Sequence, residues 1–143
     1  MKVIIAGSRD FTNYSFLVEI CDKILKKVTE EIIIVSGTAR GADTLALKYA
    51  DQKGFKTEKY PADWDKYGKS AGHIRNAVMA DVGDTLIAFW DGKSPGTKDM
   101  IQKMFLANKR FRVIIYEINF VRKIYSYKMF TENTYAEWLK EGI

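Results

Sequence analysis

Residues 32–43 read IIIVSGTARGAD and hold the pattern from which the fold can be inferred. Ile32–Ser36 is a short, continuous apolar run that stops at Gly37, which is typical of a buried strand in a parallel sheet. Apolar residues then recur at helical spacing over Ala42–Lys53, and Gly54 marks the end of that helix. The stretch therefore predicts a strand, a glycine-containing turn and a helix in direct succession.

The same alternation extends along most of the chain. Further apolar runs predict strands at Lys2–Ala6, Phe55–Tyr60, Asp84–Trp90 and Arg112–Ile118. Helical spacing predicts further helices over residues 16–28, 70–80 and 97–108. Because strands that alternate with helices form βαβ units, we expect an α/β fold with a mostly parallel, five-stranded sheet.

The last part of the chain is expected to extend this domain. Val121–Met129 predicts an added edge strand, and Ala136–Glu141 predicts a short helix. We therefore divide the chain into a domain over residues 1–118 and an extension, residues 119–143, packed on it. The extension is rich in aromatic residues, which are enriched in interfaces, so we expect it to cover a sheet edge or to pack against a second copy in a homodimer.

Composition excludes several classes of protein. The 143 residues contain one cysteine, Cys21, and one histidine, His73, so a disulfide framework and a multi-histidine metal site are excluded. No metal site and no cofactor are expected. The apolar run at the N-terminus is shorter than that of a signal peptide, and no run is long enough to span a membrane. We expect a cytoplasmic protein that does not bind membranes.

Three glycine-containing turns follow three of the predicted strands, and they point to an anionic ligand. They read GSRDF at 7–11, SGTARGAD at 36–43 and DGKSPGT at 91–97, and the last two run into helices. Carboxyl ends of parallel strands lie at one edge of a sheet, where ligands bind. Glycine lets backbone N–H groups approach an anion, and a helix N-terminus adds its dipole. The net charge of +5 is consistent with a phosphate-bearing partner, whether a nucleotide or a nucleic acid.

The predicted site draws on these turns and on the segment after the third strand. Arginine can bind phosphate in a bidentate manner, and a tryptophan such as Trp64 can stack on a base. Neither a P-loop nor an ordinary dinucleotide fingerprint is present in the sequence. The predicted ligand-binding residues are Gly7, Ser8, Arg9, Ser36, Gly37, Thr38, Arg40, Gly41, Asp43, Arg75, Asn76, Asp91, Ser94, Gly96 and Thr97.

Together, these motifs resemble the SLOG superfamily and, within it, the YspA-type, cpYpsA-related branch. The matching pieces are GSRDF, SGTARGAD, AGHIRN at 71–76 and WDGKSPGT at 90–97. SGTARGAD also resembles a loop of the DNA-processing protein A family. The resemblance implies a Rossmann-like three-layer sandwich with the strand order 3-2-1-4-5. It also implies a cavity for the phosphate and ribose of a nucleotide-derived ligand.

The resemblance also bears on catalysis. Phosphoribohydrolases that resemble lysine decarboxylases carry a catalytic glutamate in the loop after strand four, and Met100 stands at that position here. A thioether cannot act as an acid or a base, and Asp99 lies one position away. We therefore assign no catalytic residue and expect a sensor or sequestering domain. A nucleotide hydrolase and a protein that binds single-stranded nucleic acid remain the alternatives.

Overall fold

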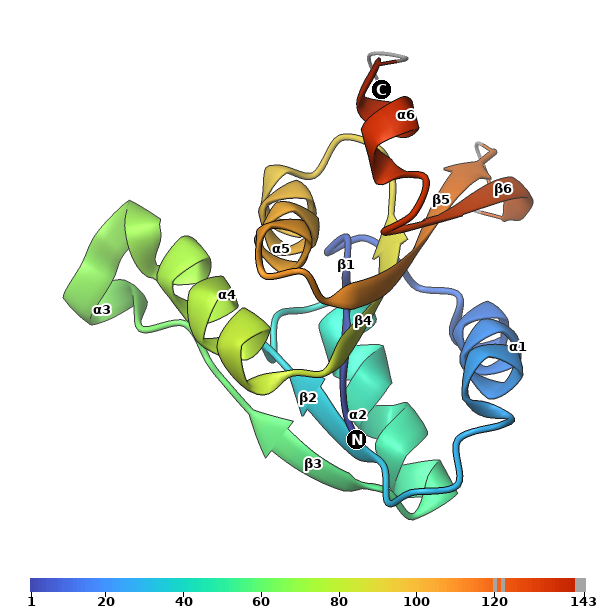
Figure 1. The fold of residues 1–143 in the computed structure, drawn as a ribbon, viewed down its shortest axis with the longest axis horizontal. Helices are drawn as coiled ribbons and strands as arrows, with labels where there is room; N and C mark the ends of the chain where they lie inside the picture. The colour runs from blue at the N-terminus through green and yellow to red at the C-terminus, as the bar shows by residue number, and fades with distance from the viewer. Residues whose placement is uncertain (120, 122, 141–143) are drawn as a thin grey trace.

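A computed structural model places residues 1–119, 121 and 123–140 in an α/β fold (Figure 1). The strands are β1 (Lys2–Gly7), β2 (Ile33–Ser36), β3 (Lys56–Lys59), β4 (Thr85–Trp90), β5 (Arg110–Ile118) and β6 (Ile124–Thr131). The helices are α1 (Tyr14–Leu25), α2 (Ala42–Lys53), α3 (Trp64–Tyr67), α4 (Ala71–Val82), α5 (Pro95–Leu106) and α6 (Tyr135–Lys140), with a 3₁₀ turn at Gly68–Ser70.

The strands form one mixed sheet of six strands in the order β3-β2-β1-β4-β5-β6. The first five strands are parallel, and their order agrees with the one that the resemblance implies. The predicted strand count is one too low. The strand expected as an extension pairs antiparallel with β5 along Arg112–Ile118 and becomes the sixth member of the sheet.

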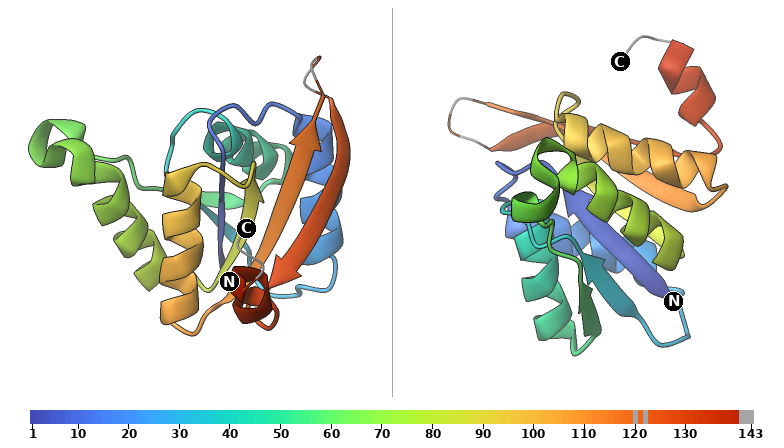
Figure 2. Two further views of the ribbon diagram at one scale, coloured as in Figure 1. Left: turned by 90° about the horizontal axis from the view of Figure 1, so that it is seen from above. Right: turned by 90° about the vertical axis from the view of Figure 1, so that its left-hand side faces the viewer.

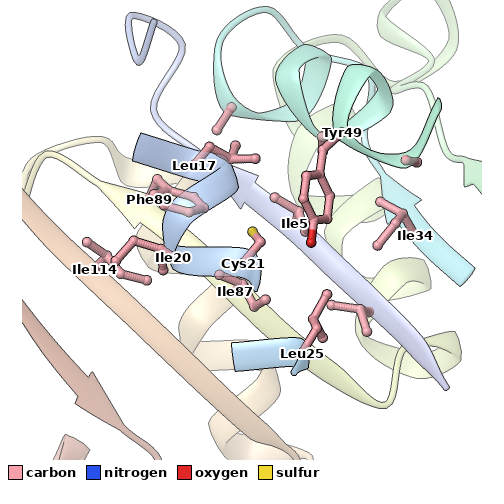
Figure 3. Packing of buried hydrophobic residues seen from close by; sticks show 14 of the residues in the cluster. Ile5, Leu17, Ile20, Cys21, Leu25, Ile34, Tyr49, Ile87, Phe89 and Ile114 are labelled. Carbon is pink, nitrogen blue, oxygen red and sulfur yellow. The ribbon is translucent and has the colours of Figure 1, made fainter. Parts of the chain in front are cut away.

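Helices cover both faces of this sheet (Figure 2). Successive side chains of β1 point to opposite faces, because side chains alternate along a strand. Val3 and Ile5 pack with α1 and α2, whereas Ile4 and Ala6 pack on the side of α4 and α5. Figure 3 shows the first of these clusters, in which Cys21 and Tyr49 lie over the centre of the sheet. None of the described helices is both long and apolar enough to cross a membrane.

The extension contributes side chains to the core. Tyr135 at the start of α6 packs edge-on against Phe111 of β5, with ring centroids 5.5 Å apart, and it is 2% exposed. Phe130 of β6 is also buried, whereas Tyr127 remains exposed. The rings of Tyr135 and Phe130 are therefore part of the core of the domain. Phe120 and the side chains of Tyr125 and Trp138, which were part of the argument for a homodimer, lie outside the described residues. The homodimer stays a prediction.

Helix α4 is held to the sheet at its C-terminal end by Lys109, which precedes β5. The Lys109 ammonium donates hydrogen bonds to the carbonyl oxygens of Ala80, Asp81 and Gly83, at 2.6, 2.8 and 2.7 Å. The last carbonyl groups of a helix lack intrahelical partners, and a cation there also interacts favourably with the helix dipole. One side chain therefore satisfies three carbonyl groups where α4 turns into β4.

We expect Lys109→Met to lower the free energy of unfolding by about 2 kcal/mol, because three carbonyl oxygens lose a charged donor. Lys98→Met is the matched control, since it removes one positive charge from an exposed position on α5. Urea unfolding of both variants and the wild type measures the difference. Equal destabilisation by the two substitutions would show that the Lys109 hydrogen bonds contribute nothing specific.

Candidate functional site

A cavity of about 540 Å³ lies at the carboxyl edge of the sheet, beside the point where strand order reverses between β1 and β4. We call it the loop cavity. It is bounded by the turns after β1, β2 and β4 and by the first turns of α4 and α5. Eleven of the predicted site residues line it: Gly7, Ser8, Arg9, Arg40, Asp43, Arg75, Asn76, Asp91, Ser94, Gly96 and Thr97.

The other four predicted residues do not line the cavity and belong to the end of β2 and the turn after it. They are Ser36, Gly37, Thr38 and Gly41, which are absent from the described lining. The buried Ser36 hydroxyl donates to the carbonyl oxygen of Asp43 at 2.9 Å and accepts from the N–H of Thr38 at 3.1 Å. These bonds fix the turn to the start of α2. A direct ligand contact by any of the fifteen residues stays a prediction.

Gly41 is required where the turns after β1 and β2 meet. It caps α2 with a φ of 83°, in the region that favours glycine. A Cβ atom at this position would collide with the carbonyl oxygens of Ser8 and Arg9. The glycine therefore lets the two turns pack against each other by their backbones.

Ser8 joins the turn after β1 to the turn after β4. Its buried hydroxyl accepts from the N–H of Asp91 at 3.0 Å and from the Ser94 hydroxyl at 3.2 Å. Asp91 itself accepts from the N–H groups of Lys93 and Ser94, at 2.9 and 2.8 Å. Burial opposes ionisation of Asp91, but these donors outweigh it and hold the pKa of its carboxyl below the ordinary value. Asp91 therefore shapes the turn as well as lining the cavity.

Arg75 and Asn76 connect α4 to the rest of the site. The Arg75 guanidinium donates to the carbonyl oxygen of Gly37 at 2.5 Å and, more weakly, to that of Tyr60 at 3.4 Å. Its Nε donates to the Asn76 side chain at 3.1 Å. The Asn76 amide in turn donates to the carbonyl oxygen of Gly96 at 3.1 Å. This chain of bonds spans the turn after β2, α4 and the first turn of α5.

Asp43 is a carboxyl group 5% exposed in the wall of the cavity, in the first turn of α2. Burial raises its pKa to about 6, because charge is disfavoured away from water. The positive charges of Arg75 and Arg9 and the N–H of Ala39, which lies 3.2 Å from Oδ2, oppose this rise. Burial of Arg75 lowers the pKa of its guanidinium, and the charge of Asp43 partly restores it.

Arg9 and Arg40 bring positive charge to the cavity from the exposed parts of two turns. Among the residues that the structure describes, neither guanidinium makes a hydrogen bond or an ion pair. Arg9 lies over the ring of Trp64, with its Cζ 5.9 Å from the ring centroid. These two cations are therefore available to an anion, in contrast to Arg75, whose donors are used by the backbone.

The first turn of α5 forms a further part of the wall. Pro95 is at its start, and the N-cap residue Ser94 makes no side-chain cap hydrogen bond. The N–H groups of Gly96 and Thr97 lie where a helix has no intrahelical acceptor for its donors. Nothing lies within 4 Å of the position that a Gly96 Cβ would occupy. The start of α5 is therefore open to a bound group.

Met100 lines the cavity, and Asp99 is held away from it. Asp99 accepts from Lys103 at 2.5 Å and from the Asn76 amide at 3.0 Å, and it lies 3.2 Å from Nδ1 of His73. The carboxylate is thus satisfied by three neighbours. Its interactions position α4 against α5.

Sequence reasoning left other lining residues unassigned. Among them are Lys69, Gly72 and His73, together with Trp64, for which the sequence suggests stacking on a base. All four lie between the end of β3 and the first turn of α4. The short helix α3 was not predicted, because four residues are too few to show helical periodicity. The signals that this segment belongs to the site are the AGHIRN motif and the aromatic ring of Trp64.

A second hollow of about 530 Å³ lies between α1, α2 and the start of β3. It is lined by residues such as Asp22, Tyr49 and Lys53 and includes none of the predicted site residues. Asp22 accepts from the Tyr49 hydroxyl at 2.8 Å and pairs with Lys53 at 2.9 Å. Asp22, Tyr49 and Lys53 in this hollow therefore interact with one another.

Two comparisons with known proteins agree with this geometry. Residues 1–67, which include the turns after β1 and β2, match the YspA, cpYpsA-related SLOG family. The Gene 61 protein of Mycobacterium phage D29 is 34% identical over 108 residues, which cover 71% of this chain and 86% of that protein. The chain therefore belongs to the YspA, cpYpsA-related SLOG family.

Proposed function

We propose that the loop cavity binds a nucleotide-derived ligand through its phosphate and ribose, and that the protein acts as a sensor or sequestering domain. The observation that carries this proposal is the pair Arg9 and Arg40. Two guanidinium groups with no carboxylate partner in the described chain face one cavity. A charge-assisted hydrogen bond from arginine to phosphate is about twice as strong as a neutral one.

The start of α5 supports the same proposal. The backbone donors of Gly96 and Thr97 and the positive end of the helix dipole suit a phosphate group. The bonds of Asn76 to Gly96 and of Ser8 to Ser94 hold this turn in place before any ligand arrives. A preformed turn reduces the ordering that binding requires.

The volume of the cavity and the negative charge of Asp43 in its wall favour a nucleotide over a free phosphate ion. A volume of about 540 Å³ falls within the range of small-molecule sites. The buried Asp43 carboxylate is an acceptor suited to a ribose hydroxyl, whereas it would repel a phosphate placed beside it. The proposal therefore places the phosphate near Arg40 and α5 and the sugar near Asp43.

A nucleotide hydrolase is the second candidate, and Asp43 is the observation that favours it. A carboxyl group in a cavity with a pKa near 6 has the property expected of a general acid or base. Against it, Met100 stands where related phosphoribohydrolases carry their glutamate, and Asp99 is held by its own partners.

Binding of single-stranded nucleic acid remains a further alternative. It would need an extended open groove, whereas the residues described here line one half-open cavity.

Arg40→Ala is the direct test of the binding proposal. We expect it to weaken binding of AMP and ADP-ribose at least about tenfold, because a charge-assisted bond to phosphate is lost. Calorimetric titration of the full chain measures the affinities, and Lys27→Ala is a control that removes an exposed charge that follows α1 and does not line the cavity. Unchanged affinity in Arg40→Ala, with a folded protein by circular dichroism, would reject the assignment of Arg40.

Product analysis in the same titrations separates binding from turnover. We expect no release of free adenine or inorganic phosphate from AMP by the wild type. Rapid release that is lost in Asp43→Asn, but kept in Asp99→Asn, would overturn the sensor proposal and establish Asp43 as the catalytic group.

The raised pKa of Asp43 predicts a specific dependence of stability on pH. The folded pKa of about 6 lies above the ordinary value of 3.8. Its contribution to stability is therefore greatest below pH 4 and decreases as the pH rises through 6. Relative to Asp43→Asn, the wild type should lose about 2 kcal/mol of unfolding free energy between pH 4.5 and 7. Urea unfolding of both proteins at several pH values measures this. Parallel pH curves would contradict a raised pKa in the folded state.

A further inference from the structure

Trp64 is an exposed indole in the wall of the loop cavity. It begins α3, it is 49% exposed, and it lines the cavity opposite the turn after β1. In both Figure 1 and Figure 2, α3 stands away from the sheet, beyond the end of β3. Tyr67 is the other aromatic residue of α3. It does not line the cavity, and its ring lies near the ammonium group of Lys66.

The backbone at Trp64 is held within α3, and the indole reaches the start of α4. The Asp63 side chain caps α3 by accepting from the N–H of Lys66 at 3.1 Å, and the N–H of Gly68 donates to the carbonyl oxygen of Trp64. The far edge of the indole lies against the start of α4, because a Cβ on Gly72 would be 3.5 Å from its Cη2 atom. The indole therefore forms the part of the cavity wall between α3 and the start of α4.

Arg9 lies over the indole at 5.9 Å, which is at the outer limit of a cation–π interaction. This spacing is less than two van der Waals contact distances of about 3.5 Å each, so a flat ring cannot enter between them without displacing Arg9. Arg9 has no other described partner to hold it there. A ring that stacks on Trp64 would therefore displace the Arg9 guanidinium from the face of the indole.

We propose that Trp64 is the base-binding wall of the loop cavity, and that the ligand is a nucleotide whose base stacks on Trp64 in the place of Arg9. The displaced Arg9 then donates to the phosphate of the same ligand. This inference rests on the proposed function, because it assigns the base end of the site whose phosphate end was described above. Every base has an aromatic face, so this wall selects a base without selecting which one.

Paired probes separate the two ends of the site. AMP carries a base and a phosphate, whereas ribose 5-phosphate carries the same sugar phosphate without the base. The full chain and three variants are titrated calorimetrically with both compounds. Trp64→Leu removes the aromatic face, and Trp64→Phe retains a smaller one. Tyr67→Leu is the matched control, because Tyr67 belongs to the same helix and is 41% exposed outside the cavity.

We expect Trp64→Leu to weaken AMP binding at least about fivefold, with Trp64→Phe in between and Tyr67→Leu unchanged. Binding of ribose 5-phosphate should stay within about twofold in all three variants. If the wild type binds both probes equally and Trp64→Leu changes neither, the base wall is wrong while the phosphate site stands. If the wild type binds neither probe, the proposed function and this inference both fail. Thermal unfolding confirms that each variant is folded.

Discussion

The Arg75 guanidinium is the interaction on which the arrangement of the site depends. It binds backbone carbonyl groups at Gly37 and Tyr60, which end two neighbouring strand segments, and through Asn76 it reaches the first turn of α5. A neutral side chain of this size could not supply as many donors in one plane. Only glycine fits at position 37, because the Arg75 guanidinium and the Asp43 carboxylate fill the space that a Cβ atom would occupy. The cavity thus exists because α4 is joined to the turns of the sheet on one side and to α5 on the other.

The hydrogen bonds of Arg75 also explain why the three arginines of the cavity differ in their availability to a ligand. Arg75 is occupied by the backbone and by the field of Asp43, so its charge is compensated within the fold. Arg9 and Arg40 make no described hydrogen bond or ion pair, although the charge of Arg9 also acts on Asp43. They come from exposed turns whose backbones are fixed by Ser8 and Gly41. A buried carboxylate beside two free guanidinium groups suits a ligand that offers both an anion and a hydroxyl group. The proposed nucleotide meets both requirements.

Much of this arrangement could be predicted from local sequence. The apolar runs at residues 2–6 and 32–36 are each followed by glycine. Parallel strands bring the turns after them to one edge of the sheet, where Ser8 and Asp43 both line the cavity. The sequence could not reveal that Arg75 binds main-chain carbonyls, because its partners lie 38 and 15 residues away. Helix α3 was missed because its four residues leave no period to detect. The sixth strand was expected only as an extension, since its lysines are typical of a sheet edge and its pairing with β5 is a tertiary contact.

Hydrogen–deuterium exchange of the full chain, with and without saturating ADP-ribose, tests the central claim most directly. The account places the ligand in the loop cavity, between the turns after β1, β2 and β4 and the α3–α4 segment. It therefore predicts slower exchange over residues 7–11, 36–43, 64–76 and 91–98, and unchanged exchange around the hollow between α1 and α2. Protection centred on that hollow instead, or no protection anywhere at saturating ADP-ribose, would contradict this placement of the ligand.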